Sequence, residues 1–123
     1  IKNNIGKKII LIDRFVDSTI AYQHYGMDID LNFINSINKF ILKNIKIDFT
    51  FLNIVNELNM KIRLSKRSNL NRYDIFKMSF YKKVQFGFIK LAIKNKKKYK
   101  IIDSNIEIEK NKKIILNTID KLI

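Results

Sequence analysis

The sequence predicts an α/β protein built on a parallel sheet. Three short apolar runs, at about residues 8–13, 48–55 and 100–104, are rich in β-branched or aromatic residues and too short for helices, so we expect strands there. Longer segments with apolar residues at helical spacing separate these runs. Strands that alternate with helices typically form parallel sheets, and a length of 123 residues suits a single domain.

The first expected strand leads directly into a short helix. Residues 8–13 form a continuous apolar run that ends on charged residues, which is typical of a fully buried strand. The following helix is expected at about residues 17–24, with Asp17 or Ser18 as its cap. Gly26 is placed to end it, because glycine adopts the left-handed backbone that often closes a helix.

The remaining helices are predicted from apolar periodicity. Asp28 or Asp30 is expected to open a helix with an apolar face of Leu31, Ile34, Ile37, Phe40 and Ile41. A long helix at about 75–95 has a core-facing stripe that consists of Phe76, Phe80, Val84, Phe88 and Leu91. Two further helices are expected, one capped by Asn56 at about 57–67 and one at about 107–122.

Composition narrows the possible functions. The chain has no cysteine, which excludes disulfides and thiolate metal sites, and no apolar run approaches the ~20 residues that span a membrane, so a cytoplasmic protein is expected. The formal net charge of +14 suggests nucleic-acid binding. However, lysine accompanies abundant isoleucine and asparagine, as an AT-rich genome would encode, and the lysines are spread along the chain. We therefore expect no specific nucleic-acid partner.

Polar side chains follow the first expected strand. Asp13 and Arg14 end that strand, and the next helix carries Ser18, Thr19, Tyr22 and Gln23. Ligands of open α/β sheets bind at the carboxyl ends of the strands. Arginine can hold a phosphate with two parallel hydrogen bonds, and an adjacent aspartate can orient that arginine or approach magnesium. The segment at 13–23 is therefore a candidate nucleotide site.

Arginine is rare in this lysine-rich chain. It occurs only at Arg14, Arg63, Arg67 and Arg72. A planar guanidinium differs from a lysine ammonium in the phosphate geometry that it can bind, so these positions are candidates for phosphate contacts. Three of them lie in the polar segment at about 61–74.

Each candidate residue also has a purely structural interpretation. Asp13 and Arg14 could form an ion pair at the strand end. Ser18 and Thr19 could cap a helix, and Tyr22 could belong to the core with its hydroxyl at the surface. The combination of all these residues at this spacing favours a binding site.

The segment Asp-Arg-Phe-x-Asp-Ser-Thr-x-Ala-Tyr-Gln at residues 13–23 resembles the nucleotide-binding signature of bacterial thymidylate kinases. The runs at 48–55 and 100–104 are similar to two strands of that family, and the segment at 61–74 resembles its mobile lid. The resemblance implies a P-loop nucleoside-monophosphate-kinase-like fold. It also implies ATP-dependent phosphorylation of dTMP to dTDP for dTTP synthesis, with Mg²⁺ accompanying ATP.

The resemblance also implies roles for individual residues. Arg14 would hold the dTMP phosphate, with Asp13 orienting it near magnesium without a direct metal bond, and Tyr22 would pack beside the deoxyribose. The thymine edge would face Ser18, Thr19 and Gln23. The lid would contribute Arg63, Arg67 and Arg72, of which Arg67 and Arg72 match the family pattern best. The loop at 103–106 would lie against the adenine of ATP.

One family motif is absent from the 123 residues, the phosphate-binding loop GxxxxGK[ST]. We therefore expect the carboxyl-terminal portion of a kinase domain whose amino-terminal strand and P-loop are missing, which would be inactive alone. The complete protein is expected to be a homodimer without membrane contact. The alternatives are a basic nucleic-acid-binding module, an inactive remnant of a nucleotide kinase, or a kinase for another monophosphate.

Overall fold

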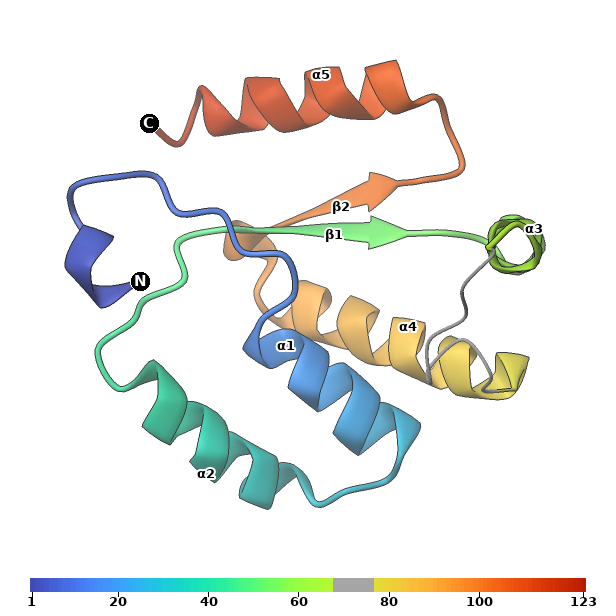
Figure 1. Cartoon of the computed structure of the whole chain (residues 1–123), viewed down its shortest axis with the longest axis horizontal. Helices are drawn as coiled ribbons and strands as arrows, with labels where there is room; N and C mark the ends of the chain where they lie inside the picture. Colours follow the sequence, from blue (N-terminus) through green and yellow to red (C-terminus); the bar gives the residue numbers. More distant parts are fainter. Residues whose placement is uncertain (68–76) are drawn as a thin grey trace.

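The computed structural model describes residues 1–67 and 77–123. It contains helices on both sides of a small sheet, as Figure 1 shows. The predicted lid at 61–74 lies partly outside the described residues, and its Arg72 is not among them. Among the helices that the structure describes, none combines the length and apolar character needed to cross a bilayer.

The sheet consists of two parallel strands. Strand β1 spans Thr50–Ile54 and strand β2 spans Tyr99–Asp103. Thr50 lies opposite Tyr99, and Ile54 lies opposite Asp103. The prediction of an α/β fold with a parallel sheet is confirmed, and both strands lie within one or two residues of their expected bounds.

The prediction of a buried strand at residues 8–13 is wrong. These residues adopt no strand, and the side chains of Ile9 and Leu11 are 68% and 85% exposed. A strand requires backbone hydrogen bonds to a neighbour. Within the described ranges, β1 pairs only with β2, and no strand lies beside residues 8–13. An apolar run indicates burial, but it does not supply the strand partner.

The core lies between two helical segments. Helix α1 at Val16–Thr19 continues into the π-helical turns η2 at Ile20–Gly26, and both pack on helix α4 at Met78–Lys94. The core cluster consists of Ala21, Phe80 and Val84. Figure 1 shows α1 and α4 on one side of the sheet and α5 on the other. The predicted helix at 17–24 is thus confirmed. Of the predicted stripe of α4, Phe80 and Val84 are buried, Phe88 and Leu91 are half-buried, and Phe76 lies outside the described residues.

Two glycines allow these helices to approach closely. A Cβ atom on Gly26 would lie 2.6 Å from the Phe80 ring, and one on Gly87 would lie 2.5 Å from the Tyr25 ring. Gly26 is the last residue of η2, as expected for a helix end. Its backbone is not left-handed, however, so close packing is the reason that it must be small.

We call α1 and η2 together the signature helix, because they carry most of the segment at 13–23. Its predicted cap at Asp17 or Ser18 is wrong. Helix α1 starts after Phe15, without a side-chain cap. The Asp17 carboxylate instead accepts a hydrogen bond from the hydroxyl of Tyr99 at the start of β2. Partial burial and the Asp17 charge raise the pKa of Tyr99 well above its ordinary value. This contact ties the signature helix to the sheet.

Helix α2 spans Leu31–Leu42 and begins at the predicted cap, where Asp30 accepts a 2.8 Å hydrogen bond from the Phe33 amide. Of the predicted apolar face, only Ile34 is buried to 2% exposure, whereas Phe40 is 79% exposed. Helix α5 at Ile108–Ile119 has no buried residue. Much apolar surface therefore remains uncovered on these two helices.

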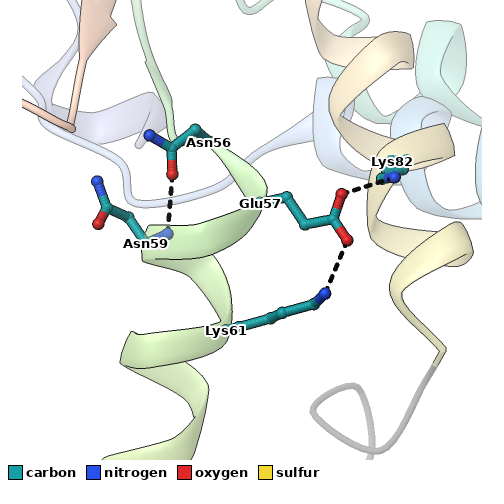
Figure 2. A network of polar contacts seen from close by, with 5 residues as sticks. All are labelled: Asn56, Glu57, Asn59, Lys61 and Lys82. Atoms are coloured by element: carbon teal, nitrogen blue, oxygen red, sulfur yellow. Dashed lines mark hydrogen bonds and ion pairs between the residues drawn. The ribbon is translucent and has the colours of Figure 1, made fainter.

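The other elements are short. Helix α3 spans Glu57–Ser65 and begins at the predicted cap Asn56, whose side chain accepts a 2.8 Å hydrogen bond from the Asn59 amide (Figure 2). The 3-10 turns η1 and η3 span Lys2–Asn4 and Lys96–Lys98.

Candidate functional site

A cavity of about 480 Å³ lies at the carboxyl end of β1, between α3 and α4. Its volume lies in the range of small-molecule sites. Aromatic rings of Tyr22, Tyr81 and Phe88 line it together with three guanidinium groups, those of Arg14, Arg63 and Arg67. Among the described residues, no aspartate or glutamate lines this cavity. The cavity therefore combines concentrated positive charge with flat apolar surfaces, which suits an anion that carries a ring.

Arg14 is held in an unusual conformation. Its φ angle of 60° lies in the left-handed region, which costs a side-chain-bearing residue about 1 kcal/mol or more. The Arg14 Nη1 donates a 3.0 Å hydrogen bond to the Tyr22 hydroxyl. The guanidinium carbon also lies 5.3 Å from the centre of the Tyr22 ring, at cation–π distance. Backbone conformation that is strained and fixed by a side-chain contact is typical of functional positions.

The Tyr22 ring is itself fixed by the core. It makes edge-to-face contacts with Phe80 and Phe88, with ring centres 6.0 and 6.3 Å apart. Phe80 and Phe88 lie on α4, so these contacts connect the position of Arg14 to the core cluster. The family resemblance implies a position for Tyr22 beside the deoxyribose, but it did not reveal the hydrogen bond between the Tyr22 hydroxyl and Arg14.

Asp13 does not hold Arg14 in this structure. The Asp13 side chain is exposed and forms no ion pair with Arg14 or with another residue of the described ranges. The expected ion pair at the strand end is therefore not observed. Its absence follows from the left-handed turn at Arg14 and from the contact of the guanidinium with Tyr22.

Arg63 lies on α3, and Arg67 follows the end of that helix, where its backbone amide donates a 3.2 Å hydrogen bond to the Leu64 carbonyl oxygen. Both arginines line the same cavity. Arg63 also donates a 2.5 Å hydrogen bond to the Ser104 carbonyl oxygen, in the loop predicted to lie on the ATP side. The Asn105 side chain in that loop accepts 3.0 Å hydrogen bonds from the Asn56 backbone amide and the Asn59 side chain. The loop at 103–106 is thus joined to the start of α3.

Three expected base contacts lie outside the cavity. Ser18, Thr19 and Gln23 are half-buried on the α1–η2 helix and do not line it. The Gln23 Oε1 is buried and accepts no hydrogen bond within the described part of the chain. A buried acceptor without a donor requires an explanation, such as a bound group.

Sequence reasoning missed several contacts around the cavity. The Gln85 side chain on α4 accepts a 3.1 Å hydrogen bond from the Val55 amide and so holds the end of β1. Glu57 on α3 forms ion pairs with Lys82 of α4 at 2.6 Å and with Lys61 of its own helix at 2.9 Å (Figure 2). Hydrogen bonds from Lys82 and Lys61 lower the pKa of the Glu57 carboxyl to about 2. Only the Glu57–Lys61 spacing was visible in the sequence.

Comparison with known proteins identifies the family. The thymidylate kinase family model matches residues 1–115. The chain belongs to the thymidylate kinase family. Its two-stranded parallel sheet and surrounding helices correspond to part of the P-loop kinase-like α/β fold of that family.

Relatives and a solved structure give the same result. The chain is 35% identical over 115 residues to a thymidylate kinase of Wolbachia sp. subsp. Brugia malayi (strain TRS), covering 94% of the chain and 54% of the relative. It is 41% identical over 102 residues to a thymidylate kinase of Ehrlichia canis (strain Jake), which covers 83% of the chain and 48% of that relative. The crystal structure of thymidylate kinase from Ehrlichia chaffeensis is similar, with a TM-score of 0.61 and 30% identity over 96% of this chain and 52% of that chain. The chain spans about half the length of these thymidylate kinases.

Proposed function

We propose that the natural protein containing this chain transfers a phosphoryl group from ATP to dTMP, forming dTDP for dTTP synthesis. The observation that carries this proposal is Arg14, fixed on Tyr22 at a cavity that also receives Arg63 and Arg67. Phosphoryl transfer requires mainly positioning and neutralisation of charge. Three guanidiniums without a lining carboxylate among the described residues supply both.

A role is proposed for each of the candidate side chains. Arg14 holds the phosphate of dTMP, because its guanidinium is fixed beside an aromatic ring that can pack on the deoxyribose. Arg63 on α3 and Arg67, two residues after the end of α3, neutralise the transferred phosphoryl group. The same role is proposed for Arg72, which lies outside the described residues. The thymine edge faces Ser18, Thr19 and Gln23, a role supported by the unsatisfied Gln23 acceptor.

Magnesium enters the site with ATP in this proposal. Among the described residues, no group of three or more His, Cys, Asp or Glu side chains could hold a metal ion. Magnesium in kinases is bound largely by substrate phosphates and water, with one or two carboxylates. The exposed Asp13 next to Arg14 fits as such a nearby carboxylate. The ion supplies neutralisation of phosphate charge, while Arg14 fixes the acceptor phosphate.

The complete enzyme is proposed to be a cytoplasmic homodimer. The support for a dimer is the uncovered apolar face of α2, where Phe33 is 60% and Phe40 79% exposed. Contiguous exposed apolar surface of this kind is typical of interfaces. Light scattering during size-exclusion chromatography measures the mass, and Phe40→Lys is expected to shift it to that of the monomer. A monomeric parent protein contradicts the proposal.

The catalytic proposal is tested by comparing the natural protein with the separate 123-residue chain. ADP formation is measured with dTMP, dUMP, dCMP, dGMP and dAMP as acceptors, and binding to DNA and RNA oligonucleotides is measured in parallel. We expect the natural protein to phosphorylate dTMP preferentially and the separate chain to be inactive. Preference for another monophosphate, or tight oligonucleotide binding without kinase activity, overturns the proposal.

A further inference from the structure

Helix α3 carries Arg63 at the cavity, yet none of its own residues is buried. Of its apolar side chains, Leu58 and Ile62 are 67% and 42% exposed, whereas Met60 and Leu64 are half-buried at the cavity. Figure 1 shows α3 beyond the carboxyl ends of the two strands. Most helices of globular proteins are held by burial of an apolar face. Because no residue of α3 is fully buried, polar contacts to other elements are expected to contribute to its position.

Polar contacts connect α3 to two other elements. Lys82 of α4 reaches across to Glu57, at an N–O distance of 2.6 Å, as Figure 2 shows. The Asn59 side chain donates a 3.0 Å hydrogen bond to the Asn105 Oδ1 in the loop after β2. Asn105 is in turn fixed by Asp103, whose carboxylate accepts 2.9 and 2.6 Å hydrogen bonds from its backbone and side-chain nitrogens.

The two lysines that pair with Glu57 differ in what they can position. Lys61 lies on α3 itself, so its ion pair moves with the helix. Lys82 lies on α4, which packs on the signature helix and lines the opposite wall of the cavity. Only the Lys82 contact can therefore set the separation of the two walls.

We propose that Lys82 and Asn105 are positioning residues that hold α3 over the cavity and thereby place Arg63 and Arg67. The placement of α3 stands on its contacts alone, whereas its effect on phosphoryl transfer rests on the proposed function. Neither residue touches the substrate in this proposal. Their effect reaches the reaction only through the two guanidiniums.

The geometric part is tested with paired nitroxide labels in the natural protein. This chain has no cysteine, so Leu58→Cys on α3 and Lys90→Cys on α4 give unique label sites within it, after any cysteine elsewhere in the protein is replaced by serine. Pulsed electron paramagnetic resonance then measures the distance distribution between the labels. Lys82→Gln and Asn105→Ala are expected to broaden it, whereas Lys61→Gln is the matched control and should leave it unchanged. Lys82→Arg should restore the parent distribution.

The kinetic part uses the same variants without labels. Because Arg14 lies outside α3, loss of the Lys82 contact should leave the KM for dTMP unchanged. We expect kcat to fall by about two- to fivefold, the range for an exposed ion pair. Lys61→Gln should keep the parent kcat.

The outcomes separate this inference from the proposed function. If the parent protein lacks dTMP kinase activity, the proposed function fails, while the distance measurement still decides how α3 is held. An unchanged distribution in both Lys82→Gln and Asn105→Ala overturns the inference even in an active enzyme. The same broadening in Lys61→Gln also overturns it, because that variant keeps the contact between helices.

Discussion

Replacement of Tyr22 by phenylalanine removes one atom from the proposed phosphate site. The Tyr22 hydroxyl accepts the 3.0 Å hydrogen bond from Arg14, while the ring makes the cation–π contact and the edge-to-face contacts with α4. Tyr22→Phe therefore frees the guanidinium from one restraint and leaves the aromatic packing in place. We expect weaker dTMP binding with little change in stability.

The magnitude follows from the exposure of Arg14. Hydrogen bonds to charged groups contribute about 1.5–3 kcal/mol when shielded, and the exposed position of Arg14 reduces this to about 1 kcal/mol. Since 1.4 kcal/mol corresponds to a factor of ten, the Kd for dTMP should rise about fivefold. The retained cation–π contact prevents a larger loss.

The assay is isothermal titration calorimetry of the natural protein with dTMP. Tyr25→Phe is the matched control, because Tyr25 lies on the same helical segment and does not line the cavity. An unchanged Kd in Tyr22→Phe, or an equal rise in Tyr25→Phe, would refute the reasoning that Tyr22 orients Arg14.

Two further predictions concern packing and pH. Gly87→Ala places a Cβ atom 2.5 Å from the Tyr25 ring, so we expect about 1–3 kcal/mol lower free energy of unfolding in urea, whereas Lys90→Ala on the same helix should change it little. Folding raises the pKa of Tyr99 above its ordinary value of 10.0. The neutral hydroxyl therefore contributes its full stabilisation below about pH 10, and this contribution is lost as the pH rises through the folded-state pKa. Tyr99→Phe should remove that part of the alkaline loss of stability in urea titrations at increasing pH. An identical alkaline profile in this variant would contradict the assignment to Tyr99.

Local signals in the sequence predicted much of the fold. The caps Asp30 and Asn56 lie where they were expected, because a cap depends on neighbouring residues alone. The strands at Thr50–Ile54 and Tyr99–Asp103 were predicted because their apolar runs match a buried parallel pair. Residues 8–13 carry the same signal but form no strand, since pairing depends on a neighbour that the run itself does not encode.

The candidate site was predictable in composition but not in geometry. The scarcity of arginine indicated Arg14, Arg63 and Arg67, and the structure brings these three to one cavity. The contact of Arg14 with Tyr22 depends on a left-handed turn, which no pattern indicated for an arginine. The Glu57–Lys82 ion pair joins different helices, so helical spacing could not reveal it.

The most direct test of the account is dTMP-dependent ADP formation by the natural protein and its Arg14→Lys variant. Lysine keeps the charge but loses the planar fork that holds a phosphate with two hydrogen bonds. We expect ADP formation that requires dTMP in the parent protein, and a fall in kcat/KM of about 10²-fold in the variant. No dTMP-dependent ADP from the parent, or full activity in Arg14→Lys, would contradict it.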